Sequence, residues 1–408
     1  MWPKQAPLLE SGRPKPRLKQ TMTDIAAVHT SLDETTAAAE DLAAQINESF
    51  DTPADAIIVF ASARFDSEAL LRILKERCKP GVLMGSSSAG EFTHAAQGSG
   101  TASALALRSD TLAFSAGLGR HVTQDSRSAA RELVSTFKGM QGGGHAYRAA
   151  LVMTDALAGH AEEFVDEMTV RTSGRYLLAG GGAGDDANFS RTHVFLDTRA
   201  YTDAAVALEI LSTKPIGVGV GHGWEPAGQP LRATEVEGMR VIGLNGMPAV
   251  EAFERHAEAT GQRFDRHNPL PFFLHNILGV DTGNGYRLRV PLSVGEDGSV
   301  QCAAEVPEQA RVHIMCTTSE SAAVAAKRAT AAAVAALGES KPGAALFFDC
   351  VATRLRLGDA FGYELAMVSD SLRGAPFVGC NTYGQIARSD SQFSGFHNCT
   401  AVVLAFPA

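Results

Sequence analysis

The sequence predicts an α/β protein with two related domains, built from duplicated strand-helix-strand-turn-strand units. Short continuous apolar runs alternate with longer segments of helical spacing, as expected for buried strands joined by helices. This succession occurs near the N-terminus and again near the C-terminus, which indicates internal duplication. The length of 408 residues exceeds the ~250–300 residues beyond which one hydrophobic core rarely grows, so two domains are expected.

The first unit opens with a helix and a buried strand. A helix is predicted over 33–50, because Leu42 and Ile46 recur at helical spacing. Residues 56–61, AIIVFA, form a short apolar run rich in β-branched side chains, which is typical of a strand covered on both faces. The unit continues with a helix over 67–78, a strand over 82–84, the turn GSSSAGEF over 85–92 and a strand over 102–107.

The same order of elements returns in two further places. Near the C-terminus it comprises a strand over 344–348, a helix over 362–371, a strand over 376–378, the turn GCNTYGQI over 379–386 and a strand over 400–406. The two turns match position by position: two glycines are separated by small or polar residues, and Glu91 or Gln385 follows. A looser copy between them has strands over 149–153, 176–179 and 193–196, a helix over 163–170 and the turn GGGAGDD over 180–186.

The predicted domain boundary lies near Asn245. There a strand over 240–244 gives way to a helix that begins at Pro248, a residue favoured in the first helical turn. Residues 23–245 are therefore expected to form an N-terminal sensory domain, and residues 246–408 a C-terminal domain.

Composition restricts the function classes. The formal net charge of -9 disfavours a nucleic-acid surface, because phosphate binding needs concentrated basic side chains. No window approaches the ~18 consecutive apolar residues of a membrane helix. Residues 1–22 are rich in basic side chains and proline and are predicted to be a disordered basic tail, since they hold no apolar segment followed by a cleavage site. These features predict a cytoplasmic protein.

The cysteines and several histidines show no metal-binding spacing. No Cys-x-x-Cys pair occurs, which disfavours a disulfide framework and a zinc ribbon. Three histidines, His256, His267 and His275, fit no short-range ligand pair. The six scattered cysteines are Cys78, Cys302, Cys316, Cys350, Cys380 and Cys399.

Six motifs follow one another along the chain. They are GSSSAGEF, GGGAGDD followed by Phe189, GVGVGHGWEP, LNGMPAVEAF, GCNTYGQI and GFHNCTAVVLAF. In these motifs the chain resembles the FIST family, the paired N- and C-terminal domains of bacterial signal-transduction proteins. The resemblance implies cytoplasmic ligand sensing with output to a partner such as a sensor histidine kinase. One branch of the family is a haem-dependent nitric oxide sensor, so the resemblance also implies haem as a candidate cofactor.

The turn GCNTYGQI is the predicted ligand site. Together with the nearby Asn398 it gathers more polar groups than a tight turn requires. The alternative, a plain strand connection, stays open for the N-terminal copy with its serines 86–88. The residues predicted to bind a ligand are Gly379, Cys380, Asn381, Thr382, Tyr383, Gly384 and Asn398.

Three histidines are the candidate haem-binding residues. An axial ligand must point into an apolar pocket, and His193 is the predicted metal ligand because it lies in an alternating strand beside Phe195. A hydrogen-bonded or surface role for His193 stays open. His222 and His397 lie in motifs typical of the family. Residues 217–224 have glycine at every second position, which leaves one strand face bare for a flat ligand or for a packed neighbouring element.

Two alternatives to haem-based sensing are kept. One is a sensor of an amino acid or other small metabolite without haem. The other is a cysteine-dependent hydrolase with Cys380 as nucleophile, His397 as base and Asn398 as the orienting group. We predict that Cys380 is not catalytic, because small buried cysteines commonly follow glycine turns for packing alone.

Overall fold

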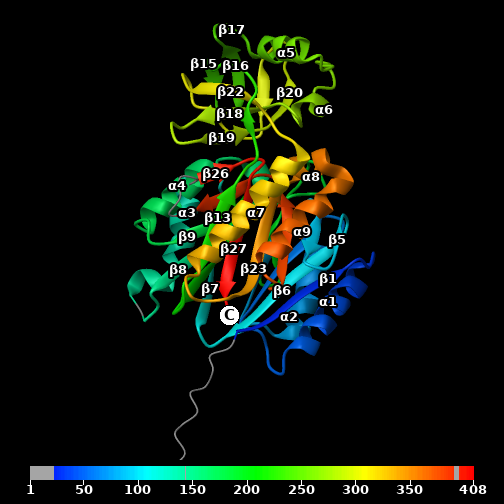
Figure 1. The fold of residues 1–408 in the computed structure, drawn as a ribbon. Coiled ribbons are helices and arrows are strands. Elements are labelled where there is room, and N and C mark those ends of the chain that lie inside the picture. Colours follow the sequence, from blue (N-terminus) through cyan, green and yellow to red (C-terminus); the bar gives the residue numbers. More distant parts are fainter. Residues whose placement is uncertain (1–22, 143, 390–394) are drawn as a thin grey trace, which may run out of the picture.

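A computed structural model describes residues 23–142, 144–389 and 395–408 of the chain. The predicted basic tail, residues 1–22, lies outside the described residues. A larger body of three mixed sheets carries a small domain at one end (Figure 1). The mixed α/β class predicted from the sequence is confirmed.

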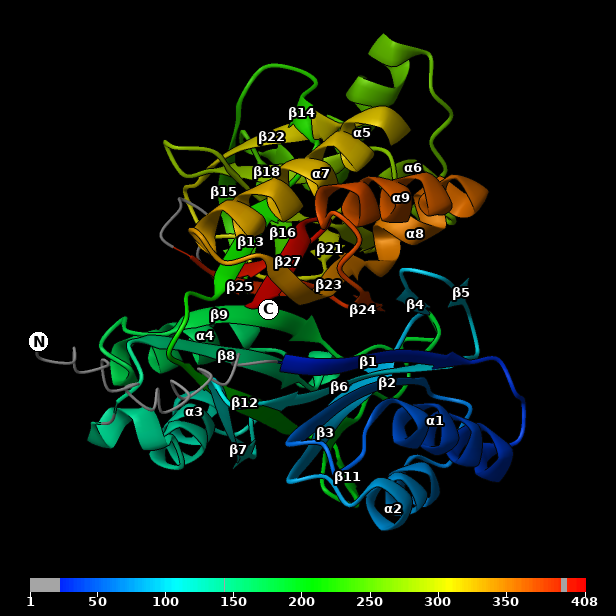
Figure 2. The same cartoon turned by 60° about the horizontal axis from the view of Figure 1, so that its bottom comes forward.

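The first sheet has the strand order β1-β6-β2-β3-β10-β11. β2 and β3 run parallel, and α1 and α2 cover the outer face of the sheet (Figure 2). The elements of this unit are β1 (Thr23–Thr30), α1 (Thr35–Ser49), β2 (Ala56–Ser62), α2 (Ser67–Cys78), β3 (Val82–Ser88), β4 (Glu91–Thr93), β5 (Gln97–Gly98) and β6 (Ala102–Ser109).

The second sheet repeats this plan with the order β26-β25-β9-β8-β12-β7. β8 and β9 are its parallel pair, and α3 and α4 pack on its outer face. The elements of this unit are β7 (Leu112–Arg120), α3 (Ser126–Ser135), β8 (Tyr147–Thr154), α4 (Ala161–Arg171), β9 (Leu177–Gly182), β10 (Val194–Leu196), β11 (Arg199–Tyr201) and β12 (Ala204–Ser212).

The third sheet has the order β13-β27-β23-β24-β4-β5. Since β13 precedes residue 245 and β23 follows it, this sheet joins the predicted N- and C-terminal domains. The elements of this unit are β13 (Gly217–Gly221), α7 (Ser319–Ala336), β23 (Pro342–Cys350), α8 (Val351–Leu357), α9 (Phe361–Ser371), β24 (Phe377–Thr382), β25 (Gln385–Arg388), β26 (Gly395–His397) and β27 (Ala401–Pro407).

The three units exchange their hairpins in a ring. The hairpin β4-β5 of the first unit pairs with β24 of the third unit, and β25-β26 of the third pairs with β9 of the second. The hairpin β10-β11 of the second unit closes the ring on β3 of the first. Each sheet is therefore completed by residues from another unit.

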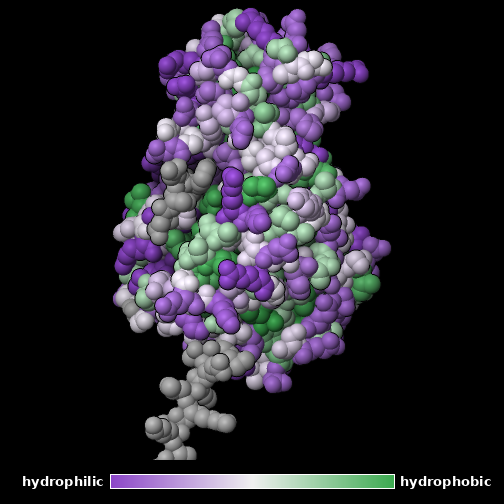
Figure 3. All heavy atoms as spheres, viewed as in Figure 1, coloured by the Kyte–Doolittle hydropathy of each residue, from purple (hydrophilic) through white to green (hydrophobic). Residues whose placement is uncertain are grey.

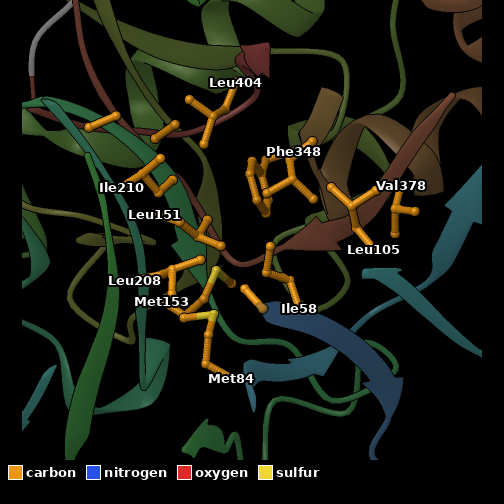
Figure 4. Close-up of a cluster of buried hydrophobic side chains, with 14 of the residues drawn as sticks. Ile58, Met84, Leu105, Leu151, Met153, Leu208, Ile210, Phe348, Val378 and Leu404 are labelled. Carbon is orange, nitrogen blue, oxygen red and sulfur yellow. The ribbon is translucent and has the colours of Figure 1, made fainter. Parts of the chain in front are cut away.

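One hydrophobic core lies where the three sheets face one another (Figure 4). Ile58 and Leu105 reach it from the first sheet, Leu151 from the second, and Phe348 and Leu404 from the third. All five side chains are fully buried. The body therefore has one shared centre, with each unit adding a second apolar layer under its own helices.

The glycine-rich strand β13 packs directly against α7. A Cβ on Gly219 would lie 1.8 Å from the carbonyl oxygen of Ala329, and one on Gly217 would lie 1.9 Å from that of Ala333. A helix backbone approaches a strand this closely only where side chains are missing. A packed helix, and not a flat ligand, therefore occupies the bare strand face noted in the sequence.

The small domain is an insertion between β13 and α7. Its two ends are adjacent, because the hydroxyl of Thr317 donates a 2.9 Å hydrogen bond to the carbonyl oxygen of Gly223. Within the described ranges, no helix combines the length and apolar character needed to cross a membrane. The elements of this domain are β14 (Glu225–Pro226), β15 (Leu231–Glu237), β16 (Arg240–Leu244), β17 (Met247–Pro248), α5 (Ala249–Thr260), α6 (Leu270–Phe273), β18 (Ile277–Asp281), β19 (Tyr286–Arg289), β20 (Pro291–Val294), β21 (Val300–Cys302) and β22 (Arg311–Cys316).

Candidate ligand-binding cavity

The three glycine-bounded turns meet one another in the body. The backbone N–H of Gly182 donates to the carbonyl oxygen of Gly384 at 2.9 Å, and that of Ala89 donates to the carbonyl oxygen of Asn381 at 3.0 Å. Each turn follows one strand of a parallel pair. The junction therefore lies at the carboxyl ends of parallel strands, where open α/β sheets commonly bind ligands.

A cavity of about 220 Å³ lies beside this junction, between the body and the small domain. From the body it is lined by residues 156, 157 and 159–162 near the start of α4, by residues of α8 and by the turn after β24. From the small domain it is lined by α6, β20 and residues 301–305. In Figure 1, α4, β26 and α8 lie at the end of the body that faces the small domain.

Exposed apolar side chains gather around this cavity. Four of its lining residues, Leu157, Phe189, Met239 and Leu355, are large hydrophobic residues with exposed fractions between 38% and 47%. They are half of the large hydrophobic residues found exposed in the described part of the chain. On the face seen in Figure 3, hydrophilic residues cover most of the small domain.

Tyr383 fixes one wall of the cavity. Its ring stacks on that of Phe189, with centroids 4.4 Å apart, and its hydroxyl donates a hydrogen bond to Asp185. Asp185 also accepts from the backbone N–H of Ser190 at 2.7 Å and of Arg191 at 2.8 Å. Burial opposes ionisation of Asp185, but these hydrogen bonds hold its pKa below the ordinary value. The anionic carboxylate therefore keeps the Phe189 loop against Tyr383.

Charged and amide groups connect the two sides of the cavity. Glu162, at the start of α4, pairs with the buried Arg289 of β19 at 2.6 Å and also with Arg287. Asn398 accepts a 3.3 Å hydrogen bond from the backbone N–H of Val290. Since Glu162, Val290 and Asn398 all line the cavity, these contacts couple its shape to the position of the small domain.

The predicted ligand residues fall into two groups: those after the end of β24 line the cavity, and those within β24 do not. Tyr383, Gly384 and Asn398 line the cavity. Gly379, Cys380, Asn381 and Thr382 do not, because they belong to β24 and are fully enclosed in the body. The amide oxygen of Asn381 accepts from Arg354 at 2.9 Å, and the hydroxyl of Thr382 accepts from Gln385 at 2.9 Å, so both side chains serve internal hydrogen bonds.

None of the three predicted haem histidines lines the cavity. His193 is half-buried just before β10. Its backbone N–H donates to the hydroxyl of Ser87, and its carbonyl oxygen accepts from the backbone N–H of Ser87. His222 follows β13 and accepts from the backbone N–H of Trp224 at 3.3 Å.

His397 lies opposite Gln385 in the β25-β26 ladder. Its burial, followed by the nearby charge of Arg289, lowers its pKa to about 3. In the described part of the chain, no group of three or more His, Cys, Asp or Glu side chains is arranged to hold a metal ion. Because none of the three histidines lines the cavity, none is placed to hold a haem there.

Cys380 lies in the central core with Val378 and Phe348. Burial raises the pKa of its thiol well above the ordinary value, which disfavours the nucleophilic thiolate. His397 belongs to a different sheet, so the strands hold the proposed nucleophile and base in separate surroundings. The geometry does not support the hydrolase alternative at Cys380.

Several cavity residues gave no signal in the sequence analysis. Leu355 and Cys350 lie on or next to α8, a short helix that was not predicted, and Glu162 meets Arg289 across 127 positions of the chain. The sequence signal that could have indicated them is that this segment directly follows an apolar strand, where ligand sites commonly lie.

Comparison with protein-family models places a FIST N domain over residues 55–247 and a FIST C domain over residues 249–388. A search of curated proteins found no match. Among solved structures, a cyanuric acid hydrolase from A. caulinodans is similar over 95% of this chain and 100% of that chain. The identity is 8% and the TM-score 0.33, so this likeness carries no functional argument. The two domain models together cover most of the chain, and the protein therefore belongs to the FIST family, whose domains are associated with small-ligand sensing in signal transduction.

Proposed function

We propose that the protein senses a small, largely apolar ligand in the cavity between the body and the small domain. The observation that carries this proposal is the gathering of exposed apolar side chains at one cavity. Water contact with so many large hydrophobic groups is unfavourable, and covering them with a ligand releases that cost. Polar groups at Tyr383 and Asn398 would orient a ligand that has one polar end.

Occupancy would be transmitted through the position of the small domain. The domain is attached by two adjacent chain ends at Gly223 and Thr317, and its further contacts with the body include the ion pair of Arg289 with Glu162. A ligand that touches both walls binds better when they are close, so it shifts the population toward that arrangement. The proposed receiver is a sensor histidine kinase, whose autophosphorylation rate should change when protein and ligand are added together.

A matched pair of surface variants tests the ligand site. Leu355→Glu places a charge in the cavity rim, whereas Tyr363→Glu places one on α9 at a similarly exposed hydrophobic residue outside the cavity. A compound library is screened by thermal shift, and the strongest binder is titrated against both variants. We expect Leu355→Glu to weaken binding by about tenfold or more, because an apolar contact is replaced by a charge, and Tyr363→Glu to bind like the parent. Equal affinity of all three proteins would contradict the proposal.

The haem-dependent version of this proposal has nitric oxide as the signal. It requires one of His193, His222 or His397 to supply an axial ligand. These side chains do not line the cavity, so a haem held by one of them would bind elsewhere in the protein. Its test is an absorption spectrum after reconstitution with haem: a Soret band that is lost in His193→Ala would support it, and the absence of any band from folded protein would exclude it.

A further inference from the structure

The charged side chains that line the cavity are mostly acidic. Among the described residues of its lining are two glutamates, Glu162 and Glu305, and no lysine or arginine. Within the same set, His160 is the one side chain that protonation makes cationic. Charged groups of one sign around a cleft raise the local concentration of ligands of the opposite sign. The lining therefore favours a cationic ligand over an anionic one.

The two glutamates differ in how far their charge is offset. Glu162 pairs with Arg287 through one carboxylate oxygen and with Arg289 through the other, and neither arginine lines the cavity. Glu305 is exposed, and Arg289 binds its backbone carbonyl oxygen, at 2.6 Å, rather than its carboxylate. Across the described residues, the Glu305 carboxylate forms no ion pair and accepts no hydrogen bond. The negative charge of Glu305 is thus available to a ligand.

An aromatic surface forms part of the body wall of the same cavity. Phe189 is 44% exposed, and its ring stacks on that of Tyr383 with an interplanar angle of 15°. Ring faces attract cations because their π electrons give them a negative potential. The Tyr383 hydroxyl donates to the anionic Asp185, and this contact makes the tyrosine ring more negative still. The aromatic pair, like Glu305, therefore favours a positive group in the ligand.

We propose that the ligand sensed in this cavity is an amphiphilic cation, an apolar chain or ring system that carries an ammonium group. The inference rests on the proposed sensing function and adds the charge of the ligand. The apolar part covers the exposed hydrophobic groups of the lining, and the ammonium group contacts the Phe189 ring and the Glu305 carboxylate. Because Phe189 belongs to the body and Glu305 to the small domain, such a ligand contacts both walls at once.

Three probes with the same alkyl chain separate the effect of charge from that of apolar contact: octyltrimethylammonium, octan-1-ol and octanoate. Each is titrated into the full-length protein by isothermal titration calorimetry, at low ionic strength and at concentrations at which none of them aggregates. We expect octyltrimethylammonium to bind about tenfold more tightly than octan-1-ol, and octanoate to bind most weakly, because the carboxylates repel it. Added salt should weaken the binding of the ammonium probe, because it screens the exposed Glu305 charge, and should not weaken that of octan-1-ol.

Matched variants locate the bound cation. Glu305→Gln should lower the affinity for octyltrimethylammonium severalfold and leave that for octan-1-ol unchanged, because only the charge is removed. Glu308→Gln is the control, since Glu308 is an exposed glutamate of the same segment that does not line the cavity, and it should bind both probes like the parent. Phe189→Leu keeps an apolar side chain without a ring, so it should weaken binding of the ammonium probe more than that of the alcohol.

The outcomes distinguish a failure of this inference from a failure of the proposed function. If octan-1-ol binds as tightly as octyltrimethylammonium, or if octanoate binds most tightly, the cavity still takes apolar ligands but the inference of a cation is wrong. Tighter binding of the ammonium probe that neither Glu305→Gln nor Phe189→Leu alters would also overturn it, because the cation then binds elsewhere. Binding of none of the three probes to the folded protein would contradict the proposed apolar site itself.

Discussion

Glu91 is a carboxyl group with no exposed surface. It accepts hydrogen bonds from the hydroxyl of Ser88 at 2.5 Å and from that of Thr101 at 2.6 Å. Burial outweighs these bonds and raises its pKa from 4.5 to about 7. The folded protein therefore keeps a proton that the unfolded chain releases, so the stability contributed by Glu91 is complete below pH 4.5 and is lost as the pH rises through about 7.

Glu91→Gln should remove this pH dependence, because an amide does not titrate. Between pH 5 and pH 8 we expect the free energy of unfolding of the variant to rise relative to the parent by up to about 3 kcal/mol, at 1.36 kcal/mol for each unit of pKa shift. Urea unfolding at several pH values measures it. A difference between variant and parent that stays constant over this range would contradict the prediction.

At the scale of elements, the contact between β13 and α7 depends on the missing side chain of Gly219. Gly219→Ala places a Cβ against the backbone of Ala329, so α7 must move away from the sheet. We expect the free energy of unfolding to fall by about 1–3 kcal/mol or more, as for other overpacked sites. Gly228→Ala is the control, since nothing lies within 4 Å of its added Cβ. Equal unfolding midpoints for the two variants in urea would argue against this packing.

The longer helices and strands could be predicted from the sequence, whereas the short hairpin strands and their pairing could not. The strands at 56–61 and 344–348 and the helix at 362–371 were predictable, because continuous apolar runs and helical spacing are local signals. The hairpin exchange was not, because strands of two to four residues carry no periodicity and their partners lie far away in the chain. The sequence identified Tyr383 at the cavity through its turn motif, but it missed Leu355, because α8 has only seven residues and was not predicted.

At the scale of the whole molecule, the small domain should be removable and the N-terminal half should not fold alone. Replacing residues 225–316 by a short Gly-Ser linker keeps every strand of the three sheets, since Gly223 and Thr317 are already adjacent. We expect the deletion variant to show a cooperative thermal transition by circular dichroism. Its midpoint should be lower than that of the parent, because the body side of the apolar cluster that includes Trp224 and Cys350 becomes exposed.

The fragment 23–245 lacks β23, β24 and β27, so we expect it to show no cooperative transition. A cooperative transition in that fragment would refute the shared-sheet interpretation.

The ring of exchanged hairpins also sets the time at which the protein can finish folding during synthesis. The hairpin β4-β5 leaves the ribosome early, whereas its partner β24 begins at Phe377. At ~5–20 residues per second, this edge waits on the order of tens of seconds for its partner. An unpaired strand edge is a template for association with other chains. Slowing initiation, so that fewer nascent chains are present together, should therefore raise the soluble yield more than slowing elongation does.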